Sequence, residues 1–282
     1  MARKTRPSGK TKAKPPRRTP ARAGGARPPR RAAARPAHQL DWQLLSTQEH
    51  ARLAFKTALL PLGTIEAHAN GPIGTDNFIP AALCRRLSAR LGIPQLPVMP
   101  YGLTCSLLAY PGACTVSSET LAAFLLDVGR SLQRNGLESL IVVNGHGGNT
   151  ATLHETAHRL FRETRLHVAV FDWWWEVQTR AAEIFGPGGM GHASIDEMGA
   201  LLGLCPELSE RVPRKKVPSF YVYKGLKTFP AVRPAMTYDH PDDPVDFARL
   251  TPEKCAQFAD VVTDVAEKVI REILTGWGEI GR

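Results

Sequence analysis

The sequence contains no apolar run that approaches the roughly 20 residues of a membrane-spanning helix, and its first residues lack the apolar middle region of a secretory signal. Its five cysteines are scattered and form no Cys-x-x-Cys pair, which argues against a zinc knuckle or a redox motif. An odd number of unclustered cysteines is also untypical of a disulfide framework. We therefore expect a cytoplasmic protein with no membrane partner, in which most thiols act as small buried hydrophobic groups.

Acidic residues are absent from residues 1–37, which contain 13 Lys and Arg residues and seven prolines. The rest of the chain has 23 basic and 26 acidic residues, so its net charge is −3 although the whole chain carries +10. With almost no large apolar side chains, residues 1–37 cannot offset the entropy lost on ordering. We expect a disordered basic tail over 1–37 and one folded domain over 38–282. The tail could be a nucleic-acid arm, an organelle transit segment or an extension without a role.

Apolar strand patterns alternate with helical periodicity in the predicted domain. The strand patterns lie at 57–62, 96–99, 139–143 and 166–171. The helical patterns run from about Pro80 to Leu91, from Ser118 to Asn135, from 150 to 161, and from Pro252 to Gly276. Strands that alternate with helices predict an α/β fold with a mainly parallel sheet covered on both faces. Ligands bind such sheets beyond the carboxyl ends of the strands.

Potential metal ligands gather in loops at these strand ends. Glu66 and His68 follow the first strand two positions apart, so they point the same way in extended backbone, and Asp76 closes the same loop. The third strand pattern is followed by Asn-Gly-His-Gly-Gly-Asn, which sets His146 among small residues. A later glycine-rich segment, 188–197, delivers another histidine and two acids. Carboxylates and imidazoles together are typical ligands of divalent metal ions.

These segments resemble, in order, the motifs of the creatininase family of metal-dependent amidohydrolases. The matching segments are 63–76, 110–120, 144–149 and 191–199, and the resemblance covers roughly residues 40–275. It implies a three-layer αβα sandwich with a mainly parallel central sheet. It also implies a homo-oligomer, since members of the family tend to be hexamers.

The same resemblance implies a centre of two divalent ions, usually zinc or manganese. Matching the motifs position by position, Glu66 and His146 would hold one ion, His68 would hold the other, and Asp76 would bridge them. Creatininase proper has a Glu two residues after the loop histidine, where this sequence has a glycine. Glu197, which matches another acid of the family, is therefore our candidate for the fifth protein ligand.

Other departures from the family pattern concern the substrate. The first loop is one residue shorter than usual and lacks its second histidine, and Gly191 stands where creatininase has an acid. These changes leave the metal centre plausible but put creatinine itself in doubt. The expected reaction is hydrolysis of a C–N amide bond in a small cyclic amide or formamide, while short peptides stay open as substrates.

These assignments suggest a mechanism, and nearby residues are candidates for contact with the substrate. Two divalent ions flanking a water would lower its pKa toward about 7 and polarise the amide carbonyl that the hydroxide attacks. The leaving nitrogen must also be protonated, and we expect His192 to be that catalytic acid. We expect the substrate to contact Trp174 and Trp175, because an indole stacks on planar amide groups. We also expect it to contact Gly147 in the loop of His146. The alternative for the tryptophans is packing in the core or in a subunit interface.

Two rival readings use other parts of the chain. His154, Glu155 and His158 match the His-Glu-x-x-His motif, in which two histidines on one helix face bind zinc. No third ligand follows at a recognisable spacing, so a solvated helix face is the alternative. A non-enzymatic nucleic-acid binder acting through the basic tail is the second rival, and the acidic remainder of the chain argues against it.

Overall fold

The computed structural model describes residues 40–69, 71–104, 107–213, 216–217 and 245–280. The tail expected over 1–37 lies outside the described residues. Within them, no helix is both long and apolar enough to span a membrane.

Three parallel strands form the central sheet in the order β1-β2-β3. They are β1 (Thr57–Leu62), β2 (Ser139–Asn144) and β3 (His167–Asp172). The register aligns their last residues, Leu62, Asn144 and Asp172, so the loops that follow the strands start at one edge. The fourth strand expected at 96–99 runs beside β1 but makes only isolated bridges there. Pro97 interrupts it and Pro94 and Pro100 flank it, and a proline has no N–H to donate to a ladder.

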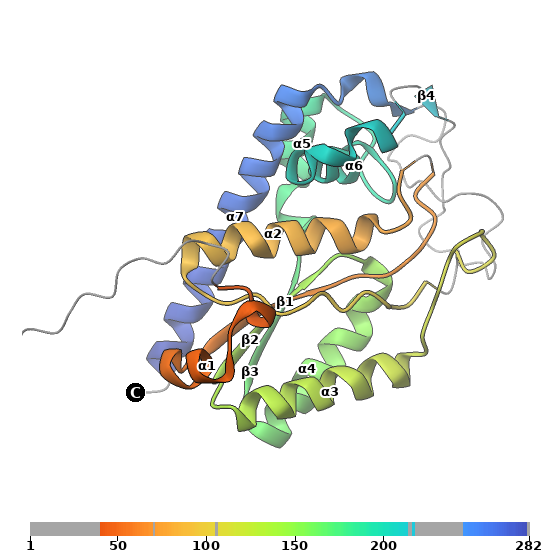
Figure 1. The fold of residues 1–282 in the computed structure, drawn as a ribbon. Coiled ribbons are helices and arrows are strands. Elements are labelled where there is room, and N and C mark those ends of the chain that lie inside the picture. Colours follow the sequence, from red (N-terminus) through yellow and green to blue (C-terminus); the bar gives the residue numbers. More distant parts are fainter. Residues whose placement is uncertain (1–39, 70, 105–106, 214–215, 218–244, 281–282) are drawn as a thin grey trace, which may run out of the picture. The chain divides into compact units, whose positions relative to one another are not determined.

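Helices cover both faces of the sheet, which confirms the αβα sandwich (Figure 1). One face packs on α3 (Ser118–Arg134) and α4 (Thr150–Thr164) through Leu60, Leu140 and Val142. Leu59, Ile141 and Val143 point the other way, because side chains alternate along a strand. Their core includes α2 (Thr75–Leu91), α5 (Gln178–Phe185), α6 (Ile195–Leu204) and α7 (Pro252–Ile280).

The remaining elements are short. They are α1 (Thr47–Leu53), an antiparallel pair β4 (Lys216–Val217) and β5 (Val245–Asp246), and 3-10 turns at Trp42–Leu44, Gly147–Asn149, Trp175–Val177, Pro206–Arg211 and Phe247–Arg249.

Helix α2 begins at Thr75, earlier than the sequence pattern predicts, and this start matters for the site. Pro80 lies in its second turn and has no N–H to donate to the carbonyl of Asp76 four residues before it. Two glycines pack against that carbonyl instead. A Cβ on Gly63 would lie 2.1 Å from the Asp76 oxygen, and one on Gly145 would lie 2.0 Å from it. The glycines therefore let the loops after β1 and β2 approach the start of α2 closely.

Helix α7 continues to Ile280, past the glycine at which the sequence pattern ends it. Its Trp277 packs against the core and lies 5.2 Å, between ring centroids, from His167 of β3. This packing outweighs the helix-weakening effect of Gly276 and Gly278, which costs about 1 kcal/mol for each glycine.

Two glycine-to-alanine changes should act in opposite directions. A Cβ on Gly203 of α6 would lie 1.9 Å from the backbone oxygen of Cys255 on α7, so Gly203→Ala should destabilise the fold by about 1–3 kcal/mol. Gly276 has no atom within 4 Å of that position, so Gly276→Ala should stabilise it by about 0.5–1 kcal/mol. Chemical denaturation measures both. Equal effects of the two changes would show that α6 and α7 are not packed this closely.

Candidate metal centre

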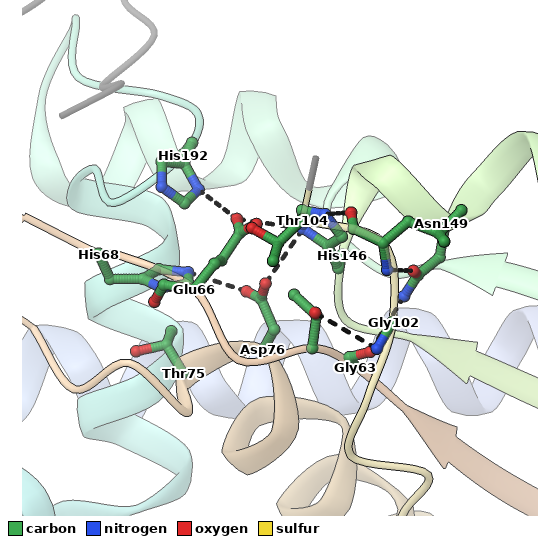
Figure 2. A network of polar contacts seen from close by, with 12 residues as sticks. Gly63, Glu66, His68, Thr75, Asp76, Gly102, Thr104, His146, Asn149 and His192 are labelled. Atoms are coloured by element: carbon green, nitrogen blue, oxygen red, sulfur yellow. Dashed lines mark hydrogen bonds and ion pairs between the residues drawn. The ribbon is translucent and has the colours of Figure 1, made fainter. Parts of the chain in front are cut away.

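The residues expected to hold metal ions meet at the carboxyl edge of the sheet. Figure 2 shows Glu66, His68, Asp76 and His146 of this set. Glu66 and His68 come from the loop after β1, and Asp76 from the first turn of α2. His146 comes from the loop after β2, and Glu197 from the first turn of α6. The first three side chains are buried, whereas His146 and Glu197 are each 13% exposed, so the cluster opens on their side.

The potential ligand atoms form two groups that share Asp76. In one group, Nδ1 of His146 lies 3.2 Å from Oε1 of Glu66 and 3.1 Å from Oδ2 of Asp76. In the other, Nε2 of His68 lies 2.9 Å from Oδ1 of Asp76 and 3.5 Å from Oε2 of Glu197. Within each group the ligand atoms lie within 4.8 Å of one another. One carboxylate oxygen of Asp76 thus faces each group, as a bridging ligand requires.

His192 lies at the edge of this cluster. Its Nδ1 is 3.4 Å from Oε1 of Glu66, and its ring centroid is 4.5 Å from that of His68. It could join Glu66 and His68 as a third set of ligand atoms. Its side chain is 18% exposed, whereas that of His68 is fully buried.

Backbone carbonyls fix the orientation of all three imidazoles. Nδ1 of His68 bonds to the carbonyl of Glu66 at 3.0 Å, and Nε2 of His146 to that of Leu103 at 2.7 Å. Nε2 of His192 bonds to the carbonyl of Ala67 at 2.7 Å. Because a carbonyl oxygen can only accept, these nitrogens carry the proton and the other ring nitrogen faces the carboxylates. Metal-binding histidines are commonly held in this way.

Mutual attraction shifts the pKa values of the cluster. Burial alone would lower the pKa of His146, but the charges of Glu66 and Asp76 outweigh it and raise this pKa to about 9. Burial likewise opposes charge on His68, yet Asp76 and Glu197 raise its pKa well above the usual value. Burial alone would raise the pKa of Asp76, but the charges and hydrogen bonds of His68 and His146 lower it. Protons on two imidazoles therefore balance the carboxylates when no cation does.

The residues fit a pair of divalent cations. Oε2 of Glu66 is buried and has no hydrogen-bond partner among the described residues, whereas Oδ2 of Asp76 pairs with Nδ1 of His146 at 3.1 Å. A buried carboxylate oxygen without a partner is costly, and a cation bound to it would remove that cost. Carboxylates together with imidazoles suit both zinc and manganese.

The structure explains why the fifth ligand cannot come from the loop after β2. A Cβ on Gly148 would lie 2.4 Å from Nε2 of His146 and 2.5 Å from the carbonyl oxygen of Leu103, so no side chain fits there. Glu197 approaches from α6 instead, and its Oε2 accepts the N–H of Ala193. This arrangement supports Glu197 as the candidate that replaces the missing acid.

The three consecutive tryptophans have different surroundings. Trp173 is buried in the core, which gives it a packing role. Trp174 is partly buried, stands edge-on to Trp173, and its Cζ2 would lie 3.8 Å from a Cβ on Gly147. Trp175 is 63% exposed. Trp174 and Gly147 therefore lie side by side next to His146, while contact of any of these residues with a substrate stays a prediction.

The rival zinc motif lies elsewhere, on α4. His154 and His158 are exposed and line a cavity of about 540 Å³ together with His167, Phe161 and Trp277. Among the described residues, none of the three groups of potential metal ligands includes them.

Sequence reasoning did not identify the segment Gly102–Thr104 as part of the site. Its contribution is the carbonyl of Leu103, which holds the ring of His146. A backbone carbonyl is present in every residue, so no residue pattern could have indicated this role.

Comparisons with known proteins identify the family of the chain. The sequence model of the creatininase family, described as creatinine amidohydrolase, matches residues 39–270, and the chain belongs to this family. It is 27% identical to the creatinine amidohydrolase of Pseudomonas putida, over 63% of this chain and 76% of that protein. It is 30% identical to the mycofactocin precursor peptide peptidase of Mycobacterium ulcerans (strain Agy99), over 58% of this chain and 64% of the peptidase.

Solved structures show the same fold. A manganese creatininase superposes with a TM-score of 0.71 and 26% identity, covering 83% of this chain and 98% of that one. A creatininase mutant of the Zn-Zn type gives a TM-score of 0.70 at 25% identity with the same coverage. The chain is thus a hydrolase of the creatininase family, which acts on C–N bonds.

Two adjacent glycines should respond differently to the same substitution. Gly148→Ala forces a methyl group against the His146 ring and Leu103, so cation affinity should fall by about 10- to 100-fold. Gly147→Ala meets only Trp174, at ordinary contact distance, and should bind cations as the unaltered protein does. Equilibrium titration with Mn²⁺ measures both. Normal affinity in the Gly148 variant would contradict the placement of His146.

Cation binding should depend on pH in a defined direction. His146 has a raised pKa of about 9, so it is protonated in the metal-free protein at neutral pH, and a cation must expel that proton. Affinity should therefore increase as the pH rises toward this value. Calorimetry in buffers of different ionisation enthalpy should detect the released protons. If the cation bound at neutral pH without releasing protons, His146 would keep its proton and could not be a ligand.

Proposed function

We propose that the chain is a metal-dependent amidohydrolase that cleaves a C–N amide bond of a small cyclic amide or formamide. The observation that carries this proposal is the pair of ligand groups joined by Asp76. Glu66 and His146 would hold one divalent ion, His68 and Glu197 the other, and Asp76 both. When bound, such ions supply Lewis acidity that lowers the pKa of water and polarises a carbonyl group.

The chain's own residues divide the remaining work. The buried part of the site consists of Glu66, His68 and Asp76. Bulk water is therefore excluded from their two carboxylates. His192 is more exposed and keeps Nδ1 on the cluster side, because Nε2 is held by the carbonyl of Ala67. A proton at Nδ1 is placed for transfer to the leaving nitrogen of an amide, which supports His192 as the catalytic acid.

The substrate would lie beside Gly147 and Trp174. The glycine leaves room next to His146, and the indole offers a flat apolar surface of the kind that stacks on planar amides. Trp175 is exposed and stays a further candidate for contact with the substrate.

A short peptide is the second candidate substrate. Gly147 has no side chain beside His146, so an extended chain could approach there, next to Trp174. Two relatives that are 30% and 31% identical to this chain are mycofactocin precursor peptide peptidases, but the chain spans only 64% and 58% of their length. Assembly into a homo-oligomer and the choice between zinc and manganese stay predictions.

His192→Ala should separate catalysis from metal binding. If His192 is the acid, the variant keeps its divalent ions and loses most of its turnover, by about 100- to 10,000-fold. Elemental analysis and a rate measurement on the same sample give both values. Loss of metal in this variant would instead make His192 a ligand, as its position near Glu66 and His68 allows.

The proposed function is tested by a hydrolysis screen of the full chain loaded with Zn²⁺ or Mn²⁺. Cyclic ureides, creatinine, formamides and short peptides form the panel, and Asp76→Asn is the inactive control because it weakens both ligand groups. We expect metal-dependent cleavage of one amide class. A doubly substituted His154→Ala, His158→Ala variant should stay fully active. Loss of metal in that variant, with activity unchanged in Asp76→Asn, would support the rival zinc motif instead.

A further inference from the structure

Asn149 lies at the start of α4 and joins three segments of the site, and none of its hydrogen-bond partners among the described residues is a candidate metal ligand. It is fully buried. Its Oδ1 accepts the N–H of Leu103 at 2.9 Å. Its Nδ2 donates to the carbonyl of Gly63 at 3.2 Å and to Oδ1 of Asn144 at 3.3 Å. These bonds connect the loops after β1 and β2 with the segment that carries Leu103, as Figure 2 shows for the labelled residues.

Both anchors of His146 depend on groups that Asn149 holds. The ring donates through Nε2 to the carbonyl of Leu103, whose N–H is bound by Asn149. The backbone N–H of His146 donates to Oδ1 of Asn144, the atom that also accepts from Asn149. A shift of Asn149 would therefore be passed to the ring and to the main chain of His146 together.

The packing around Asn149 leaves little freedom for this contact. A Cβ on Gly102 would lie 2.4 Å from Oδ1 of Asn149 and 2.4 Å from the carbonyl oxygen of Gly63. A residue larger than glycine at 102 would push the three segments apart. The close approach is thus built from a buried amide and a residue without a side chain.

Stabilisation of α4 does not explain these bonds. Asparagine at a helix start commonly accepts a hydrogen bond from the first-turn N–H groups of that helix. Ser117 does this for α3, where its side chain accepts from the N–H of Thr120. The Asn149 side chain makes no such bond to α4, and its hydrogen bonds within the described part of the chain go to other segments.

We propose that Asn149 is a positioning residue of the candidate metal centre, which acts through the backbone of Leu103 to keep Nδ1 of His146 directed at Glu66 and Asp76. This inference rests on the proposed function, since the group it positions is a metal ligand there. It predicts that a change at Asn149 weakens cation binding although the side chain coordinates nothing.

The test compares substitutions at position 149 with a control on the same helix. Asn149→Ala and Asn149→Ser remove the bond to Leu103 and should weaken Mn²⁺ binding by the full chain about 10- to 100-fold. Asn149→Asp keeps an oxygen that accepts the Leu103 N–H and should bind more tightly than either. Thr156→Val removes a buried hydroxyl whose one hydrogen bond to a described residue goes to the Thr152 carbonyl within α4, and it should lower thermal stability while leaving the affinity unchanged.

Calorimetric Kd values and the melting temperature of the metal-free variants are both recorded. Two results would overturn the proposal: unchanged affinity in Asn149→Ala or Asn149→Ser whatever the loss of stability, or equal losses in the aspartate and alanine variants. The serine variant gives the answer if the alanine variant does not fold. Failure of the unsubstituted protein to bind Mn²⁺ or Zn²⁺ would overturn the proposed function itself, so the two failures are distinguishable.

Discussion

Negative charge held out of water is the constraint on which the rest of the site depends. Glu66 and Asp76 are buried together, and Glu197 lies within reach of the same imidazole as Asp76. Carboxylates this close repel one another, and burial increases the repulsion, so they persist only with positive charge between them. Protonated imidazoles supply that charge in the metal-free protein, and divalent cations would supply it in the active one.

The fold brings these groups together by ordinary means. Three strands end in register, so the loops after β1 and β2 start side by side. Asp76 and Glu197 lie in the first turns of α2 and α6, where the helix dipole favours a negative charge. Glycines at 63 and 145 let the loops touch the start of α2, and backbone carbonyls orient the histidines. The scaffold therefore sets the ligand geometry before any cation binds.

Much of this could be predicted from the sequence, because apolar runs mark the strands and ligand types cluster just after them. The strand pattern at 57–62 agrees with the structure, which also brings Glu66, His68, Asp76, His146 and Glu197 together, while their role as metal ligands stays a prediction. The predicted start of α2 was wrong, because the first residues of this helix are polar and resemble a loop. The role of Leu103 could not be predicted, because its carbonyl acts without regard to side-chain identity. Nor could the clash at Gly148, which depends on the distance to His146.

Anomalous X-ray diffraction from crystals grown with Mn²⁺ or Zn²⁺ tests the central claim most directly. The account predicts two peaks on either side of the Asp76 carboxylate, one next to Nδ1 of His146 and Glu66, the other next to Nε2 of His68 and Glu197. A single peak beside His154 and His158, or no peak within coordination distance of Asp76, would contradict it.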